Sequence, residues 1–168
     1  MLLESDFPLD EETDNGMTAF QLAAYHGRLD IIKYMIQYLK DKQNEEYKNY
    51  ILNKVNPFSH LSTLAYSILN QNNEIAQALI VFGAMAFYDE TDEQRDFSPI
   101  FMAVQKDDQA LLEVMCDHGA LLTVKNSVGM TPLMFAAEQN YQNIVNYLSL
   151  RTTDLNEEDS NSITILVH

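Results

Sequence analysis

The 168-residue sequence has no tryptophan, one cysteine and five glycines. With Cys116 as the only cysteine, no disulfide can form within the chain, which fits a reducing compartment. No apolar run reaches the ~18–20 residues that cross a bilayer, and the start MLLESDFPLDEE lacks the basic segment and apolar core of a secretory signal. We therefore expect a cytoplasmic chain without membrane insertion.

Basic residues are also scarce. Ten Lys and Arg stand against 25 Asp and Glu, so the formal net charge is -15. A field of this sign repels phosphate backbones and anionic lipids, which argues against nucleic acid or membrane as the main partner. It favours a protein partner with a basic face, mainly through faster encounter. The alternative is that the acidic surface only keeps the protein soluble.

Sequence motifs for catalysis or metal binding are missing as well. There is no G-x-S-x-G, no glycine-rich phosphate loop and no H-E-x-x-H. The run from Cys116 to His118 lacks the further ligands of a zinc site. The acidic cluster within 89–96 lacks the central glycine and ligand spacing of a calcium loop. We therefore expect no enzymatic activity, no cofactor and no metal.

What the sequence does contain is a recurring phrase. It reads GMTAFQLAAYHG from Gly16, SPIFMAVQKDD from Ser98 and GMTPLMFAAEQN from Gly129. Aligning each copy on its small hydroxyl residue gives successive steps of 44, 36, 33 and 33 residues. These anchor residues are Thr18, Ser62, Ser98, Thr131 and Thr164. A fixed period of ~20–50 residues predicts a stacked repeat array.

The period near 33 and the T-P-L-H-x-A-like core resemble the ankyrin-repeat family over nearly the whole chain. The resemblance implies an all-α solenoid of stacked helix-turn-helix units with short finger loops. Thr18 should cap the first helix through its side-chain oxygen. Gly27 and Asn140 should close helix turns in the left-handed conformation.

The register divides the chain into a single array with irregular ends. Its predicted parts are the tail of a preceding repeat (1–13), repeat 1 (14–39), an insertion (40–57), repeat 2 (58–88), repeat 3 (89–122), repeat 4 (123–153) and a partial repeat 5 (154–168). Because both ends fall within a repeat, we expect a segment of a longer ankyrin protein. The alternative is a complete small protein with irregular caps.

The insertion lies between about Tyr38 and Phe58 and contains a helical pattern that Pro57 should stop. The pattern is formed by Tyr47, Tyr50, Ile51, Leu52 and Val55. Insertions in repeat arrays often map to the binding face. The alternative is a lengthened connector without a special role.

Ankyrin arrays usually bind partners in a groove lined by fingers and first helices, and the resemblance transfers these variable positions by register. In repeats 1 and 2 they are Asp14, Asn15, Met17, Tyr25, His26, Phe58, Ser59, Leu61, Leu69 and Asn70. In repeats 3 and 4 they are Gln94, Arg95, Phe97, Gln105, Lys106, Ser127, Val128, Met130, Glu138 and Gln139. In repeat 2 the insertion shifts the finger, and of its five positions Leu61 is the principal candidate.

The residue before each anchor is apolar in every copy: Met17, Leu61, Phe97, Met130 and Ile163. Side by side on the fingers, these residues would form an exposed apolar stripe of the kind that marks protein-binding sites. In the alternative, they pack between adjacent fingers.

The function predicted from the resemblance is that of a non-enzymatic scaffold or adaptor in a larger assembly. The main alternative is a regulatory or targeting segment of a larger enzyme or ion channel. A free-standing inhibitor is a third possibility.

Overall fold

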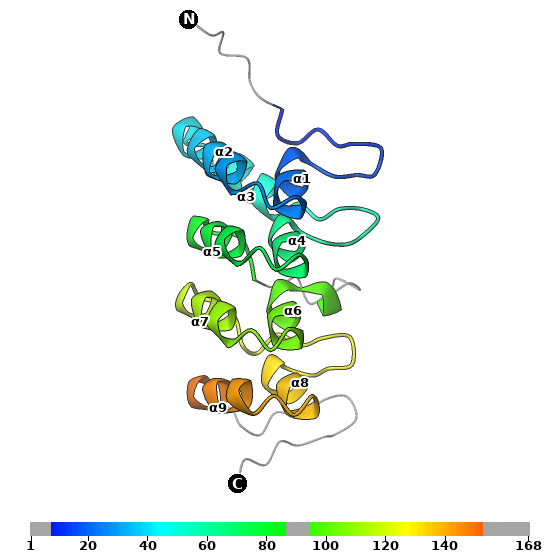
Figure 1. Cartoon of the computed structure of the whole chain (residues 1–168), viewed down its shortest axis with the longest axis vertical. Helices are drawn as coiled ribbons and strands as arrows, with labels where there is room; N and C mark the ends of the chain where they lie inside the picture. The colour runs from blue at the N-terminus through cyan, green and yellow to red at the C-terminus, as the bar shows by residue number, and fades with distance from the viewer. Residues whose placement is uncertain (1–7, 87–94, 153–168) are drawn as a thin grey trace, which may run out of the picture.

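Paired antiparallel helices stack in two layers through residues 8–86 and 95–152, the part of the chain that this computed structural model describes (Figure 1). In these ranges all regular structure is helical, which confirms the all-α solenoid. The helices are α1 (Ala19–Tyr25), α2 (Leu29–Lys42), α3 (Glu45–Asn53), α4 (Thr63–Leu69), α5 (Asn73–Phe82), a 3-10 turn (Arg95–Phe97), α6 (Pro99–Gln105), α7 (Gln109–Asp117), α8 (Pro132–Glu138) and α9 (Gln142–Arg151).

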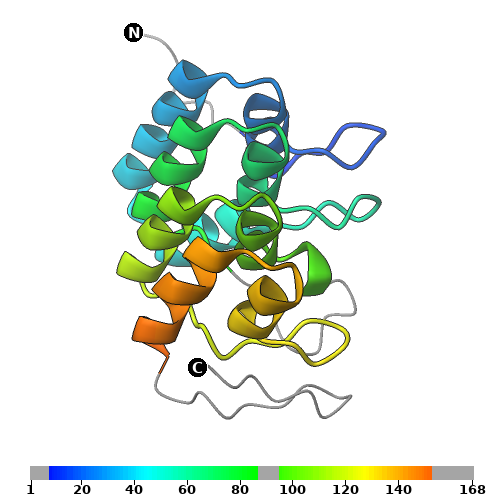
Figure 2. The same ribbon diagram turned by 60° about the horizontal axis from the view of Figure 1, so that its bottom comes forward.

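The short helices α1, α4, α6 and α8 form an inner layer, and the longer α2, α5, α7 and α9 form an outer layer (Figure 2). Hydroxyl side chains start three of the inner helices. Thr18, Ser62 and Thr131 each accept a hydrogen bond from the backbone N–H three residues later, which satisfies one orphan donor of the first turn. Gln21 Oε1 accepts in return from the Thr18 N–H at 3.1 Å. The predicted cap at Thr18 is therefore confirmed.

Each inner helix joins its outer helix through one residue in the left-handed region. These residues are Gly27, Gln71, Asp107 and Asn140, with φ of 68°, 58°, 53° and 62°. Each lies the same number of residues after its anchor residue, so this left-handed turn recurs in every repeat. The left-handed turns predicted at Gly27 and Asn140 are confirmed.

The core runs continuously between the two layers. Large side chains such as Phe20, Leu64, Ile100 and Leu112 are fully buried. Burying one such side chain stabilises the fold by roughly 1.5–3 kcal/mol. The inner helices approach each other closely because alanines face their neighbours, and these are Ala24, Ala65, Ala103 and Ala136, all with no exposed surface.

The insertion forms the extra helix α3, which packs against α4 and buries Ile51 and Leu52 completely. The predicted helix is confirmed, but the prediction that it extends to Pro57 is wrong, because α3 ends at Asn53. The chain leaves the helical conformation at Lys54, where ψ is 126° and the carbonyl accepts from Gln21 Nε2 at 2.9 Å. The Asn53 side chain accepts from the Met85 N–H at 2.7 Å.

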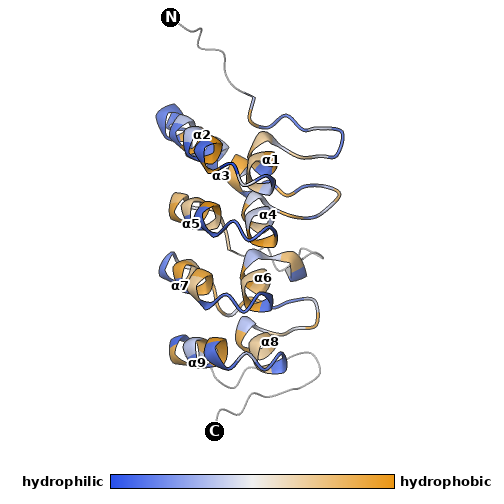
Figure 3. Ribbon diagram, viewed as in Figure 1, coloured by the Kyte–Doolittle hydropathy of each residue, from blue (hydrophilic) through white to orange (hydrophobic). Residues whose placement is uncertain are grey.

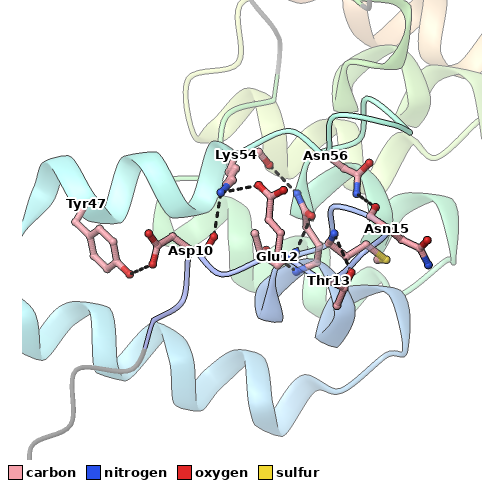
Figure 4. Close-up of polar contacts among 10 residues, drawn as sticks. Asp10, Glu12, Thr13, Asn15, Tyr47, Lys54 and Asn56 are labelled. Carbon is pink, nitrogen blue, oxygen red and sulfur yellow. Dashed lines mark hydrogen bonds and ion pairs between the residues drawn. The ribbon is translucent and has the colours of Figure 1, made fainter.

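Polar contacts join the insertion to the loop before α1 (Figure 4). Lys54 Nζ donates to the Asp10 carbonyl at 3.1 Å and pairs with Glu12 Oε1 at 2.8 Å. The bond with Glu12 is the main cause of the raised pKa of the Lys54 ammonium. Tyr47 Oη donates to Asp10 Oδ1 at 3.5 Å. These contacts fit a structural connector better than a free binding loop.

The four lysines of the insertion also face aromatic rings of the array. Lys40 and Lys48 lie over the Phe82 ring, Lys42 over Tyr38 and Lys54 over Tyr50, all within 5.6 Å of the ring centroid. A cation at this distance is attracted by the ring's π-face. Much of the insertion's positive charge is therefore used within the molecule.

Candidate functional site

Loops ahead of the inner helices project from one side of the array, away from the outer layer (Figure 2). We call these loops fingers. The described ones are finger 1 (8–18), finger 2 (54–62) and finger 4 (124–131), and the 3-10 turn Arg95–Phe97 is the described end of finger 3.

An asparagine side chain shapes finger 4. Asn126 Oδ1 accepts from the N–H of Val128 at 3.2 Å and of Met130 at 2.8 Å. The Asn126 N–H donates to the Met130 carbonyl at 3.0 Å and closes the loop at Gly129, where φ is 85°. Asparagine suits this position because its side chain can replace backbone partners within a turn.

Finger 2 repeats this design with one more residue. Asn56 Oδ1 accepts from the N–H of Phe58 at 2.9 Å and of Ser59 at 2.8 Å, and its own N–H donates to the Leu61 carbonyl at 3.0 Å. His60 takes the left-handed position with φ of 59°. The extra residue places the Phe58 side chain at the tip, 71% exposed.

Hydrogen bonds join neighbouring fingers in two pairs. Asn56 Nδ2 donates to the Asn15 carbonyl at 2.9 Å, which joins fingers 1 and 2. Asp96 accepts from the Ser127 N–H at 2.7 Å and also from its hydroxyl, which joins fingers 3 and 4.

A groove of about 440 Å³ opens between the two finger pairs, over the inner helices. We call it the finger groove. Its walls are mostly apolar, and its lining residues are Ser59, Leu61, Leu69, Asp96, Phe97, Phe101, Met102, Gln105, Asn126, Ser127, Val128 and Phe135. Phe101 and Phe135 meet edge to face at 6.1 Å in its floor. Concave sites with apolar walls and few polar groups are the usual form of binding pockets.

Apolar side chains are also exposed around the finger groove. Phe97, Val128 and Leu69 line it and are 45%, 44% and 42% exposed. Tyr25 on α1 and Phe58 on finger 2 are exposed as well, at 46% and 71%. Finger 1 itself is hydrophilic, whereas finger 2 carries hydrophobic residues (Figure 3). A clustered apolar surface with a polar rim marks interaction sites.

Most of the site residues predicted from the sequence lie exposed on the finger side. Those with exposed side chains are Asp14, Asn15, Tyr25, His26, Phe58, Leu69, Asn70, Phe97, Gln105, Lys106, Ser127, Val128, Glu138 and Gln139. Met17 and Ser59 are partly buried. Arg95 belongs to the 3-10 turn, whereas Gln94 and Ile163 lie outside the described residues.

The exposed apolar stripe predicted on the fingers holds only in part. Leu61 and Met130 are 7% and 6% exposed, so at these positions the packed alternative is correct. Both residues directly follow a left-handed residue, His60 or Gly129, where the chain turns back toward its inner helix. Their side chains therefore enter the protein instead of standing on the finger tip.

Sequence reasoning missed Phe101, Phe135, Asp96 and Asn126 as groove residues. One signal was available for the two phenylalanines, because each stands beside another large apolar residue on a short helix. Such a helix cannot turn every apolar side chain toward one core. No comparable signal marked Asp96, whose role depends on a neighbouring finger.

Titratable side chains in the described part of the chain are scattered. No group of three or more His, Cys, Asp or Glu residues is placed to hold a metal there. Cys116 is partly buried on α7, and burial raises the pKa of its thiol. Burial also raises the pKa of the nearby Tyr147 phenol to about 12. No helix in the same residues is long and apolar enough to cross a membrane.

Stacked helix pairs with projecting fingers define a repeat-built, non-catalytic interaction fold. A family model described as ankyrin repeats (3 copies) matches residues 64–159, and a second, ankyrin repeats (many copies), matches residues 1–36. The chain therefore belongs to the ankyrin-repeat family. A search of curated protein sequences found no match.

Solved structures show the same fold. A chain in the complex of the predatory endopeptidase Bd0816 from Bdellovibrio bacteriovorus with immunity protein Bd3460 is similar at a TM-score of 0.70 and 24% identity. The match covers 95% of this chain and 77% of that one. The ankyrin repeat domain of Bcl-3, a member of the IkappaB protein family, is similar at a TM-score of 0.68 and 21% identity. That match covers 90% of this chain and 62% of the other, less than two thirds of its length.

Proposed function

We propose that this chain is a scaffold or adaptor module that binds a protein partner through its fingers and inner helices. The observation that carries the proposal is the set of exposed apolar side chains Leu69, Phe97 and Val128 that line the finger groove, to which α1 and finger 2 add exposed Tyr25 and Phe58. The family supports it, because ankyrin repeats generally serve as protein-interaction modules and the solved neighbours include a complex between proteins. The single cysteine fits action in the cytoplasm.

Affinity capture from cells with mild crosslinking and mass spectrometry tests this proposal. The finger variant combines Tyr25→Ser, Phe58→Ser and Phe97→Ser. The control variant combines Val81→Ser and Leu150→Ser, which remove exposed apolar side chains from the outer helices α5 and α9. All these side chains are at least 45% exposed, so both variants should fold normally.

We expect the finger variant to lose partners that both the wild type and the control variant retain. Equal capture by all three proteins would contradict binding through the finger side. In that case the array acts as an internal regulatory or targeting segment of a larger protein, the second function considered.

A further inference from the structure

We infer that the finger groove is an anchor pocket for a peptide segment of the partner that carries one bulky apolar side chain next to Lys or Arg. The inference rests on the proposed function and specifies the partner's chemistry. It draws on the shape of the groove, on its charge and on the charge of the whole chain.

The shape of the groove favours a short peptide segment with a large apolar side chain. Its volume of about 440 Å³ belongs to one hollow, bounded on one side by finger 2 and on the other by fingers 3 and 4. Leu69, Phe101 and Phe135 come from three successive inner helices and form its apolar floor. Binding energy in protein interfaces concentrates where one anchor side chain fills a pocket of this kind.

The charge of the groove favours a cation beside that anchor. Among the described residues that line it, Asp96 is the only ionisable one, and none is Lys or Arg. Both carboxylate oxygens of Asp96 accept from Ser127, which fixes the negative charge at the wall. A carboxylate oxygen can accept more than one hydrogen bond, so a Lys or Arg of a peptide can still bind there.

The net charge of -15 disfavours negatively charged occupants. A second copy of this chain would bring the same negative charge to the groove, and an acidic peptide or a nucleic acid would be repelled in the same way. A basic segment is attracted over a distance and then held by its apolar anchor. The expected ligand is therefore basic as well as apolar.

Peptide selection on the intact chain tests the inference. A displayed library of random short peptides is selected on immobilised protein, and the enriched peptides are labelled and titrated by fluorescence anisotropy. We expect them to share one Leu, Ile, Met or Phe next to Lys or Arg. Their binding should weaken as salt increases, because rim charges are screened.

Three variants locate the bound peptide. The groove variant combines Leu69→Ser with Val128→Ser. It should weaken peptide binding about tenfold or more, because it removes two exposed apolar side chains that line the groove. Asp96→Asn should weaken binding several-fold while its amide oxygen can still accept from Ser127. The control pair Val81→Ser and Leu150→Ser should leave the Kd within about twofold, because it lies on the outer helices.

The inference is overturned if no peptide is enriched, if the enriched peptides are acidic or lack an apolar anchor, or if the groove variant binds them like the wild type. If the finger variant loses its cellular partners but the Leu69 and Val128 substitutions leave peptide binding unchanged, the anchor pocket is contradicted and the proposed function stands. If every variant captures the same cellular partners, both the anchor pocket and the proposed function are contradicted.

Discussion

The first pair of repeats (α1, α2, α4 and α5) and the second pair (α6 to α9) share one architecture but are joined by different contacts. In the first pair, the insertion supplies a buried helix and the side chains of Asn53, Lys54 and Asn56, which bond to segments on either side. In the second pair, the ties between repeats lie at the surface. They are Asp96 with Ser127, Tyr141 with the Gln105 carbonyl and Arg151 with Asp117.

The difference shows that a break in the repeat period can strengthen an array. In the first pair, α3 buries Ile51 and Leu52 completely, and the bond from Asn56 Nδ2 to the Asn15 carbonyl is partly buried, so both are costly to lose. Exposed ion pairs contribute only about 0–1 kcal/mol. We therefore expect the first pair to be the more rigid support and the second pair to open more readily next to the finger groove.

The largest expected effect comes from the core of the insertion. Leu52→Ala should lower the free energy of unfolding by about 2–5 kcal/mol, because Leu52 is fully buried in α3 and its removal leaves a cavity. Leu150→Ala serves as the control, because Leu150 is 88% exposed. Urea denaturation measures both. A loss below about 0.5 kcal/mol for Leu52→Ala, the range of surface changes, would show that α3 is not part of the core.

The next effect concerns the contact between fingers 1 and 2. A Cβ on Gly16 would lie 2.9 Å from the Pro57 ring and 3.0 Å from Phe58, and φ at Gly16 is +70°. Gly119 has a similar φ of +85° but open space around its Cα. Both Ala substitutions should cost roughly 1–2 kcal/mol for the left-handed backbone. Gly16→Ala should cost about 1–3 kcal/mol more, because it overpacks the finger contact.

Thermal and urea unfolding of the two glycine variants compare them directly. Equal losses would mean that fingers 1 and 2 are not in firm contact at Pro57.

A smaller effect isolates one hydrogen bond between fingers. Asn56→Asp keeps the side-chain acceptor that shapes finger 2 but removes the Nδ2 donor to the Asn15 carbonyl. Asn126→Asp keeps the matching acceptor in finger 4, where Asn126 Oδ1 shapes the finger in the same way. The Asn56 variant should be less stable than the Asn126 variant by about 1–3 kcal/mol, because the partly buried bond to the Asn15 carbonyl is lost and a negative charge then faces that carbonyl oxygen.

Chemical denaturation at neutral pH measures this difference between the asparagine variants. The opposite order of stability would mean that the bond between fingers 1 and 2 contributes nothing.

The smallest expected effect concerns the hydrogen bonds between Asp96 and Ser127 in the second pair of repeats. Ser127→Ala removes the hydroxyl that bonds to Asp96 but keeps the backbone bond at 2.7 Å. Because both residues are exposed, the loss should be about 0.5–1.5 kcal/mol, the net value of one hydrogen bond. Hydrogen exchange should accelerate at the amides of finger 4 and stay unchanged in finger 2. Equal acceleration in both fingers would contradict separate finger pairs.

Local features of the fold could be predicted from the sequence, because neighbouring residues determine them. The cap at Thr18 and the left-handed turns at Gly27 and Asn140 depend on bonds and backbone preferences within a few residues. The helix in the insertion was predicted from its apolar spacing. Its end was not, because the chain turns out of the helix at Lys54, whose carbonyl bonds to Gln21 in another part of the chain.

The candidate site could be predicted only coarsely. Among the positions that the register predicted, Phe97 and Val128 line the finger groove. It could not show that Leu61 and Met130 turn inward, because their burial depends on the chain reversal before them. It also missed Phe101 and Phe135, whose role in the groove depends on the space between fingers 2 and 3.

The insertion also has a consequence for how the chain folds. In a linear array folding can start in any unit and then spread to its neighbours. The segment 45–56 contacts the loop before α1, the helix α4 and the loop after α5, so it brings together three parts of the chain at once. We expect the folding nucleus to form there and to extend repeat by repeat toward α9, so that one end of the finger groove, at α4, becomes ordered early and the other, at α8, becomes ordered late.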